Sequence, residues 1–292
     1  MRSRHRRSRA VLAALAAAVL GAAGCDTAGG GSAAPKARQT RPAPVWDPSP
    51  GSIAAVGDSI TRGFDACTVL SDCPEVSWAT GSSPEVDSLA VRLLGKAKAA
   101  GRSWNYAVTG ARMADLPGQM ARAAAHRPEL VTVMVGANDA CRASVAAMTP
   151  VADFRAGFEE AMRTLRKALP KTQVYVASVP DLKRLWSQGR TNPLGKRVWR
   201  LGICPSMLAD ADALDAAATE RRATVERRVA DYNAVLREVC AADRLCRGDG
   251  GAVHAFRFGP RQLSHWDWFH PSVNGQARLA EIAYRAVTAE RP

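Results

Sequence analysis

The chain has 292 residues, of which 47% are hydrophobic, and it carries a formal net charge of +13. This composition is typical of a globular protein and excludes an intrinsically disordered chain. The positive charges are spread along the sequence and are not grouped with aromatic residues. We therefore expect no nucleic-acid partner, and at most a general attraction to anionic surfaces or cell-wall polymers.

The first 24 residues are predicted to be an export signal. Five arginines precede an uncharged stretch, residues 10–24, that is rich in Ala, Leu and Val. This stretch is shorter than the roughly 20 residues that a membrane-spanning helix needs, and it suits the core of a signal peptide. Arg6-Arg7 leaves a twin-arginine signal open as an alternative, although the residues after the pair fit that pattern poorly.

Cys25 is a candidate for lipidation, because Ala22-Ala23-Gly24-Cys25 resembles a bacterial lipobox. Ala22 stands where Leu is usual, and an ordinary signal peptide cut at small residues is the alternative. Residues 25–50 consist mainly of Gly, Ala, Ser and Pro, which cannot bury much apolar surface and so predict a flexible linker. We favour a lipoprotein, secreted or anchored to the outer face of the cell membrane, whose folded domain is residues 51–292.

From residue 51 onward, short apolar runs alternate with helical stretches. Four runs predict buried strands: residues 53–56, 104–108, 130–135 and 173–179. The spacing of apolar residues predicts helices over residues 85–100, 151–168, 208–240 and 273–289. This alternation predicts an α/β fold, in which helices cover both faces of a parallel sheet.

Residues 181–206 fit no simple element and interrupt this alternation. A connection of this length inside a compact domain is often functional. It follows a predicted strand, and so belongs on the face where α/β proteins place their sites. Trp186 and Trp199 within it are candidates for contact with lipid or glycan.

Six cysteines follow Cys25, and an even number in an exported chain predicts three disulfides. Proximity in sequence favours Cys67–Cys73 and Cys240–Cys246, each of which closes a short loop. Cys141 and Cys204 are then left to pair. Such a bond would tie residues 181–206 to the chain that follows the strand at 130–135.

Two motifs carry residues that suit attack on an ester. Ser59, in Gly57-Asp58-Ser59-Ile60, follows a predicted strand on a tight turn, where its hydroxyl is exposed and backbone N–H groups lie near. Asp267 stands three residues before His270, so it can fold back onto the Nδ1–H group and leave Nε2 free to act as a base. Each motif alone has another reading: most Gly-Asp-Ser strings are simple turns, and Asp267 can cap a turn while His270 is a buried partner.

Two further motifs supply hydrogen-bond donors at strand ends. Asn138, in Gly136-Ala137-Asn138-Asp139, can aim its side-chain N–H at a developing oxyanion. Gly110 has no side chain, so its backbone N–H can approach the same oxygen closely. Asn-Asp and Gly are also common turn residues, and that is the alternative for both positions.

Taken together and in this order, the four motifs resemble the four conserved blocks of the SGNH hydrolases, also called the GDSL esterase and lipase family. The resemblance covers roughly residues 53–289. It implies that Ser59 is the nucleophile, that His270 and Asp267 complete a triad, and that Ser59, Gly110 and Asn138 form the oxyanion hole. Ile60 replaces the Leu of the family name. The six cysteines resemble those of exported actinobacterial members with three disulfides.

The resemblance also implies a three-layer α/β/α sandwich, flavodoxin-like, with a mostly parallel sheet of about five strands and no metal or organic cofactor. We expect a monomeric, exported serine esterase that hydrolyses lipid or small acyl esters. An O-acetylesterase acting on cell-wall or plant polysaccharide is one alternative, and a non-catalytic surface-binding lipoprotein is another. Gly-x-Ser-x-Gly and His-Glu-x-x-His are absent, which argues against the α/β-hydrolase elbow and one class of zinc hydrolase.

Overall fold

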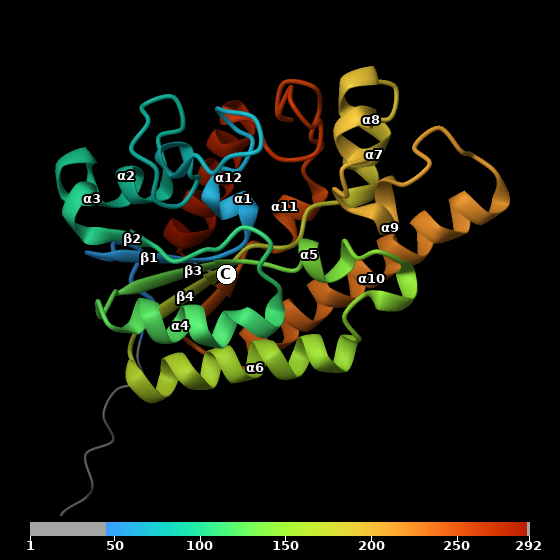
Figure 1. Cartoon of the computed structure of the whole chain (residues 1–292). Coiled ribbons are helices and arrows are strands. Elements are labelled where there is room, and N and C mark those ends of the chain that lie inside the picture. The colour runs from blue at the N-terminus through green and yellow to red at the C-terminus, as the bar shows by residue number, and fades with distance from the viewer. Residues whose placement is uncertain (1–44, 291–292) are drawn as a thin grey trace, which may run out of the picture. The chain divides into compact units, whose positions relative to one another are not determined.

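The computed structural model describes residues 45–290, and its centre is a five-stranded sheet (Figure 1). The strands lie in the order β2-β1-β3-β4-β5, and every neighbouring pair is parallel. Their bounds are β1 Ile53–Gly57, β2 Ser103–Asn105, β3 Leu130–Met134, β4 Gln173–Val176 and β5 Cys246–Gly248. The order changes direction between β1 and β3, and at such a switch point the carboxyl ends of the strands leave a crevice.

The three central strands bury every residue, which is why their sequences are continuous apolar runs and do not alternate. The end of β1 is fixed by a close approach to β3. A Cβ atom on Gly57 would lie 2.1 Å from the carbonyl oxygen of Met134, and its φ of +146° also favours glycine. The chain can therefore turn sharply after β1 only because this residue is glycine.

Helices cover both faces of the sheet, as Figure 1 shows. On one face lie α4 (Leu116–Ala124), α6 (Val151–Ala168) and α10 (Ala216–Ala241); on the other lie α2 (Leu89–Leu94), α3 (Lys96–Arg102) and α12 (Val273–Thr288). The long helix α6 buries a stripe that repeats every three or four residues: Phe154, Phe158, Ala161, Met162 and Leu165. The predicted three-layer α/β/α fold with a parallel five-stranded sheet is thus confirmed.

Shorter helical segments connect these elements. They are α1 Ser59–Arg62, α5 Ala137–Ala140, α7 Leu182–Gly189, α8 Pro193–Trp199, α9 Pro205–Leu208 and α11 Ala252–Ala255, with 3-10 turns η1 Pro74–Val76, η2 Met113–Asp115 and η3 Val145–Ala147. Within residues 45–290, none of the helices combines the length and the apolar character that crossing a bilayer demands.

Three helical predictions need correction. The single helix expected at 85–100 is two helices, because Gly95 has a φ of +75° and interrupts the ladder. The helix expected from residue 208 begins at Ala216, where Asp215 accepts a hydrogen bond from the N–H of Ala218. The segment 181–206 is largely helical: Asp181 caps α7 and Asn192 caps α8 in the same way.

The sheet also differs from its prediction at its edges. The strand expected at 104–108 is β2, which ends at Asn105, and the one expected at 173–179 is β4, which ends at Val176. The strand β5 was not predicted, because its sequence, Cys-Arg-Gly, is not an apolar run and only Arg247 in it is buried. Edge strands bury less surface than central ones, so their sequences carry a weaker signal.

The structure contains all three expected disulfides: Cys67–Cys73 and Cys240–Cys246, which proximity in sequence favoured, and Cys141–Cys204, which joins the two cysteines left over. The predicted linker, by contrast, ends before residue 50. The indole Nε1–H of Trp46 donates to the carbonyl of Val287 at 2.8 Å, and the Gln173 amide donates to the carbonyl of Asp47 at 2.9 Å. The predicted export signal, Cys25 and the linker up to residue 44 lie outside the described residues.

Candidate active site

The structure brings Ser59, His270 and Asp267 together at the carboxyl ends of the strands. Ser59 is the first residue of α1, directly after β1, and its Oγ lies 3.0 Å from Nε2 of His270. Nδ1 of His270 lies 2.5 Å from Oδ2 of Asp267. Asp267 is fully buried, whereas His270 and Ser59 keep 9% and 6% of their surface exposed. Solvent or substrate can therefore reach the hydroxyl and imidazole but not the carboxylate.

The loop that carries Asp267 and His270 is held in place from several directions. Ser264 donates its N–H to the carbonyl of His270 at 2.8 Å, so the loop folds back on itself. Trp199, at the end of α8, donates its indole N–H to the carbonyl of Asp267 at 2.6 Å. The segment 181–206 thus supports the loop. Trp186 and Trp199, the candidates for lipid or glycan contact, are largely buried, at 8% and 4% exposed.

Burial and charge shift the pKa values of Asp267 and His270 in opposite directions. Burial alone would raise the pKa of Asp267, but the adjacent His270 and two backbone N–H groups, from Phe269 and His270, lower it below its ordinary value. Burial alone would lower the pKa of His270, but the Asp267 carboxylate raises it above its ordinary value of 6.5. The imidazolium that forms when His270 accepts a proton is therefore stabilised in this site.

Three hydrogen-bond donors face the same space as the Ser59 hydroxyl. Among the described residues, the backbone N–H groups of Ser59 and Gly110 have no hydrogen-bond acceptor. Asn138 uses one N–H of its side-chain amide to reach the carbonyl of Ala111 at 3.0 Å, which leaves its second N–H to serve another acceptor. Gly110 has a φ of +84°, and a Cβ atom there would meet nothing within 4 Å, so backbone conformation is what favours glycine.

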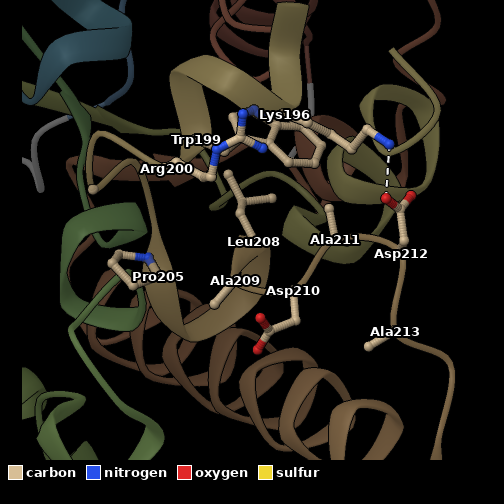
Figure 2. A pocket seen from close by; sticks show the side chains of 11 residues that line it. Lys196, Trp199, Arg200, Pro205, Leu208, Ala209, Asp210, Ala211, Asp212 and Ala213 are labelled. Carbon is tan, nitrogen blue, oxygen red and sulfur yellow. Dashed lines mark hydrogen bonds and ion pairs between the residues drawn. The ribbon is translucent and has the colours of Figure 1, made fainter. Parts of the chain in front are cut away.

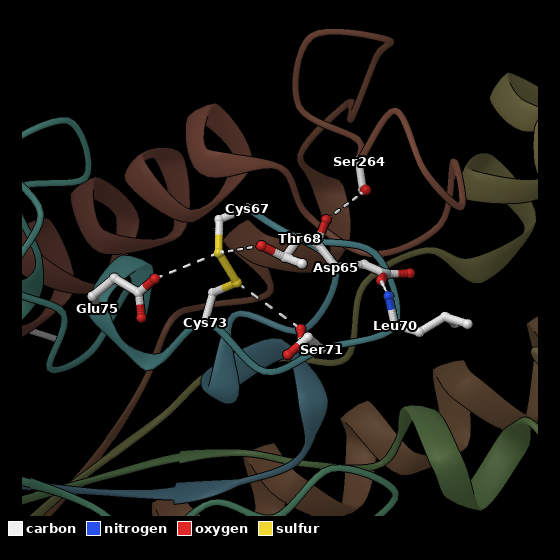
Figure 3. The surroundings of a disulfide bond; sticks show 8 residues. All are labelled: Asp65, Cys67, Thr68, Leu70, Ser71, Cys73, Glu75 and Ser264. Atoms are coloured by element: carbon white, nitrogen blue, oxygen red, sulfur yellow. Dashed lines mark hydrogen bonds between the residues drawn. A yellow bond between two sulfur atoms is a disulfide. The ribbon is translucent and has the colours of Figure 1, made fainter.

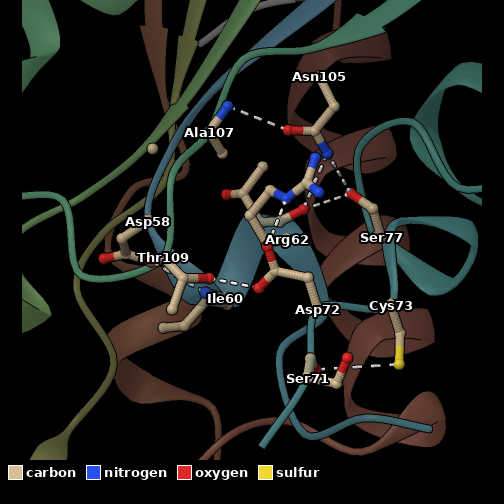
Figure 4. Close-up of polar contacts among 12 residues, drawn as sticks. Asp58, Ile60, Arg62, Ser71, Asp72, Cys73, Ser77, Asn105, Ala107 and Thr109 are labelled. Atoms are coloured by element: carbon tan, nitrogen blue, oxygen red, sulfur yellow. Dashed lines mark hydrogen bonds and ion pairs between the residues drawn. The ribbon is translucent and has the colours of Figure 1, made fainter. Parts of the chain in front are cut away.

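Polar contacts hold the Gly110 loop against α1 (Figure 4). The Thr109 hydroxyl donates to Asp72, and Asp72 also accepts from Nε of Arg62 at 3.0 Å. Asn105, at the end of β2, donates its side-chain amide to the carbonyl of Thr61 at 3.0 Å. The loop after β2 is therefore fixed relative to the helix that begins with Ser59.

Asp139 and Gln119, which the sequence analysis did not identify, hold the chain segments around the oxyanion-hole donors in place. The buried Asp139 accepts from the N–H of Met113 at 2.9 Å and from the Thr149 hydroxyl at 2.8 Å, which links α5 to the chain after Gly110. Gln119 of α4 brackets Gly57, accepting from its N–H at 2.7 Å and donating to its carbonyl at 2.9 Å. The Asp that ends Gly136-Ala137-Asn138-Asp139 was a sequence signal that could have indicated the first of these residues.

The site opens into a hollow of about 170 Å³. One side presents the polar groups described above, and the other is apolar, formed by Ile60, Phe64, Leu182, Leu185, Ile203 and Phe269. Cys141 and Cys204 also line it, so their disulfide lies at the edge of the site as the sequence predicted. Of Trp266, Trp268 and Phe269, which flank His270 in the sequence, Phe269 lines this hollow.

A second hollow, of about 490 Å³, shares Gly202 with the first. Figure 2 shows its lining, which mixes the buried Trp199 and Leu208 with charged side chains. Lys196 forms an ion pair with Asp212 at 2.7 Å across it, and Arg200 and Asp210 also border it. This neighbouring space is therefore more polar and larger than the hollow beside Ser59.

Two sets of the described side chains have ligand atoms close enough together to hold a metal ion, but in each set two of these atoms already bind one another. Among residues 45–290, one such set is Cys67, Cys73 and Glu75, but its two sulfurs are joined in a disulfide. The other is Asp65, Asp267 and His270, where a metal would have to replace the hydrogen bond between His270 and Asp267. The geometry of this site favours proton transfer along hydrogen bonds.

Comparison with known proteins gives one family and several solved structures. A model of the family described as GDSL-like lipase/acylhydrolase matches residues 53–283. An extracellular lipase from Streptomyces rimosus is 18% identical, with 80% of this chain and 99% of that chain covered and a TM-score of 0.43. No curated protein matches.

Two other solved structures are similar to a comparable extent. A Clostridium thermocellum family 3 carbohydrate esterase is 15% identical, with 80% of this chain and 94% of that chain covered and a TM-score of 0.47. A GDSL-like lipase from Bacteroides thetaiotaomicron is 16% identical, with 81% and 85% covered and a TM-score of 0.44.

Proposed function

Because the chain belongs to the GDSL-like lipase/acylhydrolase family, we propose that it is an exported serine esterase that cleaves carboxylic esters through an acyl-enzyme. The observation that carries this proposal is the line of contacts from Ser59 through His270 to Asp267, at 3.0 and 2.5 Å. A nucleophile, a base in reach of it and a carboxylate that orients the base are the parts that acyl transfer requires.

The proposed reaction has two steps. His270 takes the proton of Ser59 as the hydroxyl attacks the ester carbonyl, and then gives it to the leaving alcohol. Water attacks the acyl-enzyme in the same way and releases the acid. In both steps the negative oxygen is stabilised by the N–H groups of Ser59 and Gly110 and by the amide of Asn138, which have no competing acceptor for these hydrogens among the described residues.

The size of the hollow beside Ser59 supports a short acyl group. A buried cavity of about 150 Å³ holds a molecule the size of benzene. The 170 Å³ here must take the acyl chain and part of the reacting ester group, and Leu182, Leu185 and Phe269 close its apolar side. We therefore propose acyl groups of about two to four carbons as the preferred substrates, since a longer chain would have to leave the apolar wall.

A second candidate function is O-acetylesterase activity on a polysaccharide. It is favoured by the larger polar hollow next to the small one, where Lys196, Arg200, Asp210 and Asp212 offer both donors and acceptors (Figure 2). Sugar hydroxyls need such partners when they leave water. An acetyl group beside Ser59 with its sugar over this second hollow would use both spaces.

A panel of p-nitrophenyl esters of rising chain length tests the proposal. We expect kcat/KM to be highest for acetyl to butyryl esters and to fall for longer chains. Ser59→Ala should abolish turnover, whereas Asn138→Ala should lower kcat by roughly 10²–10³, the usual cost of one oxyanion donor. Release of acetate from acetylated oligosaccharides, faster than from p-nitrophenyl acetate at equal concentration, would favour the polysaccharide function.

Controls separate an enzyme from a binding protein that keeps the fold. Ser144 is exposed and lines neither hollow, so Ser144→Ala should behave like the wild type. A fluorophosphonate probe should label the wild type and fail to label Ser59→Ala. Absence of labelling in the folded wild type, or equal and mild losses in Ser59→Ala and Asn138→Ala, would overturn the proposal.

A further inference from the structure

A second buried carboxyl group lies beside Asp267 and has no part in the mechanism above. Asp65 is fully buried, and one of its carboxyl oxygens lies within 4.8 Å of a carboxyl oxygen of Asp267 and of a ring nitrogen of His270. Resting on the proposed function, we propose that Asp65 is a positioning residue: its protonated carboxyl donates a hydrogen bond to Asp267 and completes a chain that runs from Asp65 to Ser59.

The observed hydrogen bonds leave one acceptor position free on Asp267 and one carboxyl oxygen of Asp65 without a partner. An ionised carboxylate has about four acceptor positions. Asp267 uses two on Oδ1, for the N–H groups of Phe269 and His270, and one on Oδ2, for Nδ1 of His270. Oδ2 of Asp65 is buried and has no partner within residues 45–290, so a proton on it supplies the missing donor for the remaining position on Asp267.

The loop around Asp65 is built to keep the side chain there (Figure 3). Its backbone has a φ of +58°, in the left-handed region that non-glycine residues seldom occupy. Its N–H donates to the carbonyl of Ser71 at 3.0 Å, and its carbonyl accepts from the hydroxyl of Ser264 at 2.6 Å. The Cys67–Cys73 disulfide closes the same loop. Ser264 also bonds to His270, so one residue positions both sides of the pair.

Electrostatics decides which of the two carboxyls keeps the proton. Two carboxylates this close in a buried site cannot both ionise cheaply. Burial and the charge of Asp267 raise the pKa of Asp65 above the ordinary value of an aspartate, although the Leu70 N–H that bonds to Oδ1 lowers it. Asp267 has the lowered pKa, so it is the ionised partner. Asp58, whose pKa burial raises to about 7, is the other acidic group that acts on His270.

Two substitutions separate the donor role from the charge. Asp65→Asn keeps an N–H for Asp267 and an oxygen for Leu70, but it cannot ionise. An ionised Asp65 raises the pKa of His270, and the proposed base must be neutral in the free enzyme. Because the proposed donor is a protonated and uncharged Asp65, the acid limb of kcat/KM in Asp65→Asn should coincide with that of the wild type, with kcat at the optimum within about threefold of the wild type.

Asp65→Ala removes the donor altogether. We expect kcat to fall roughly 10- to 100-fold with little change in KM, the loss expected when a charged group loses one hydrogen bond. The experiment measures kcat and KM for p-nitrophenyl acetate from pH 4.5 to 9 for the wild type, both variants and Glu75→Gln. Glu75 lies in the same region but is exposed, so this carboxyl-to-amide control should match the wild type.

The outcomes separate a positioning role from a purely structural one. If Asp65→Ala lowers the melting temperature but leaves kcat per folded molecule unchanged, the inference is wrong. It is also wrong if the acid limb of Asp65→Asn lies at lower pH than that of the wild type, because Asp65 would then be ionised in the wild type. Should Ser59→Ala retain activity, the proposed function itself fails. If Ser59→Ala is inactive while both Asp65 variants behave as wild type, only the role of Asp65 is overturned.

Discussion

The charge of His270 controls when the proposed base can act, and it depends on single side chains. The imidazole must be neutral to accept the proton of Ser59. The Asp267 carboxylate raises the pKa of His270 above 6.5. Near neutral pH, a larger fraction of His270 is therefore protonated in the free enzyme than would be the case for an isolated histidine. The raised pKa narrows the pH range in which the free enzyme is active, but it stabilises the imidazolium that forms while Ser59 attacks the ester.

We expect kcat/KM to decline as pH falls through a value above 6.5, the ordinary pKa of histidine. Asp267→Asn removes the charge that raises the His270 pKa, so the decline should begin at a lower pH. The same change should lower kcat by roughly 10³–10⁴, as the loss of the orienting aspartate does in other triads. The measurement is the pH profile of ester hydrolysis for the two proteins. A small loss in kcat would mean that another group orients His270.

At the scale of residues, sequence motifs located the groups that meet substrate but not those that hold them. Ser59, Asp267 and His270 stand in short motifs whose spacing has a chemical meaning. Asp65 and Trp199 stand in no such motif, because the fold brings them near Asp267 from segments that are distant in the sequence. No local sequence pattern predicts that Asp65 adopts a left-handed backbone conformation and that its side chain is buried.

At the scale of elements, the sequence predicted what burial dictates. The strands β1 and β3 lie between two layers of helices, so every residue is apolar or small, and the run stops where a glycine turns the chain. The helix α6 was predicted with both of its bounds, Val151–Ala168. The short helices α7, α8 and α9 were missed because each has only two turns or fewer of periodicity; their signals are the caps Asp181 and Asn192.

The Cys141–Cys204 disulfide connects α5 to the start of α9 and borders the small hollow. Replacing both cysteines by serine opens a loop that separates them by 63 positions, which in the chain-entropy model costs about 4 kcal/mol. We expect the melting temperature to fall by roughly 10 °C. The preference for short acyl chains should also weaken, because the apolar wall around Ile203 loses its anchor.

The matched control replaces Cys240 and Cys246, which are only 6 positions apart and lie outside the hollow beside Ser59. That change should cost about 2 kcal/mol and leave the acyl preference as it was. Thermal melts and the ester panel measure both effects. An unchanged acyl preference in the Cys141→Ser, Cys204→Ser protein would show that the disulfide stabilises the fold without shaping the site.

At the scale of the whole molecule, the point where the chain enters the domain lies opposite the candidate site. Trp46 and Asp47 bind near the end of α12 and the first residue of β4, and the chain then enters β1 at its amino end. Ser59, Gly110 and Asn138 stand beyond the carboxyl ends of the strands. The first described residues therefore join the domain at the edge remote from the site.

Three disulfides are compatible with an extracellular protein, and the anchor itself can be tested by fractionation. In a host that processes lipoproteins, the wild type should sediment with membranes and Cys25→Ser should appear in soluble form. Ser32→Ala, in the predicted linker, is the control and should stay with the membranes. Because the first described residues join the domain at the edge remote from Ser59, kcat/KM for a soluble ester should be the same in both forms. Equal distribution of the wild type and Cys25→Ser would show that the ordinary signal peptide is the right alternative.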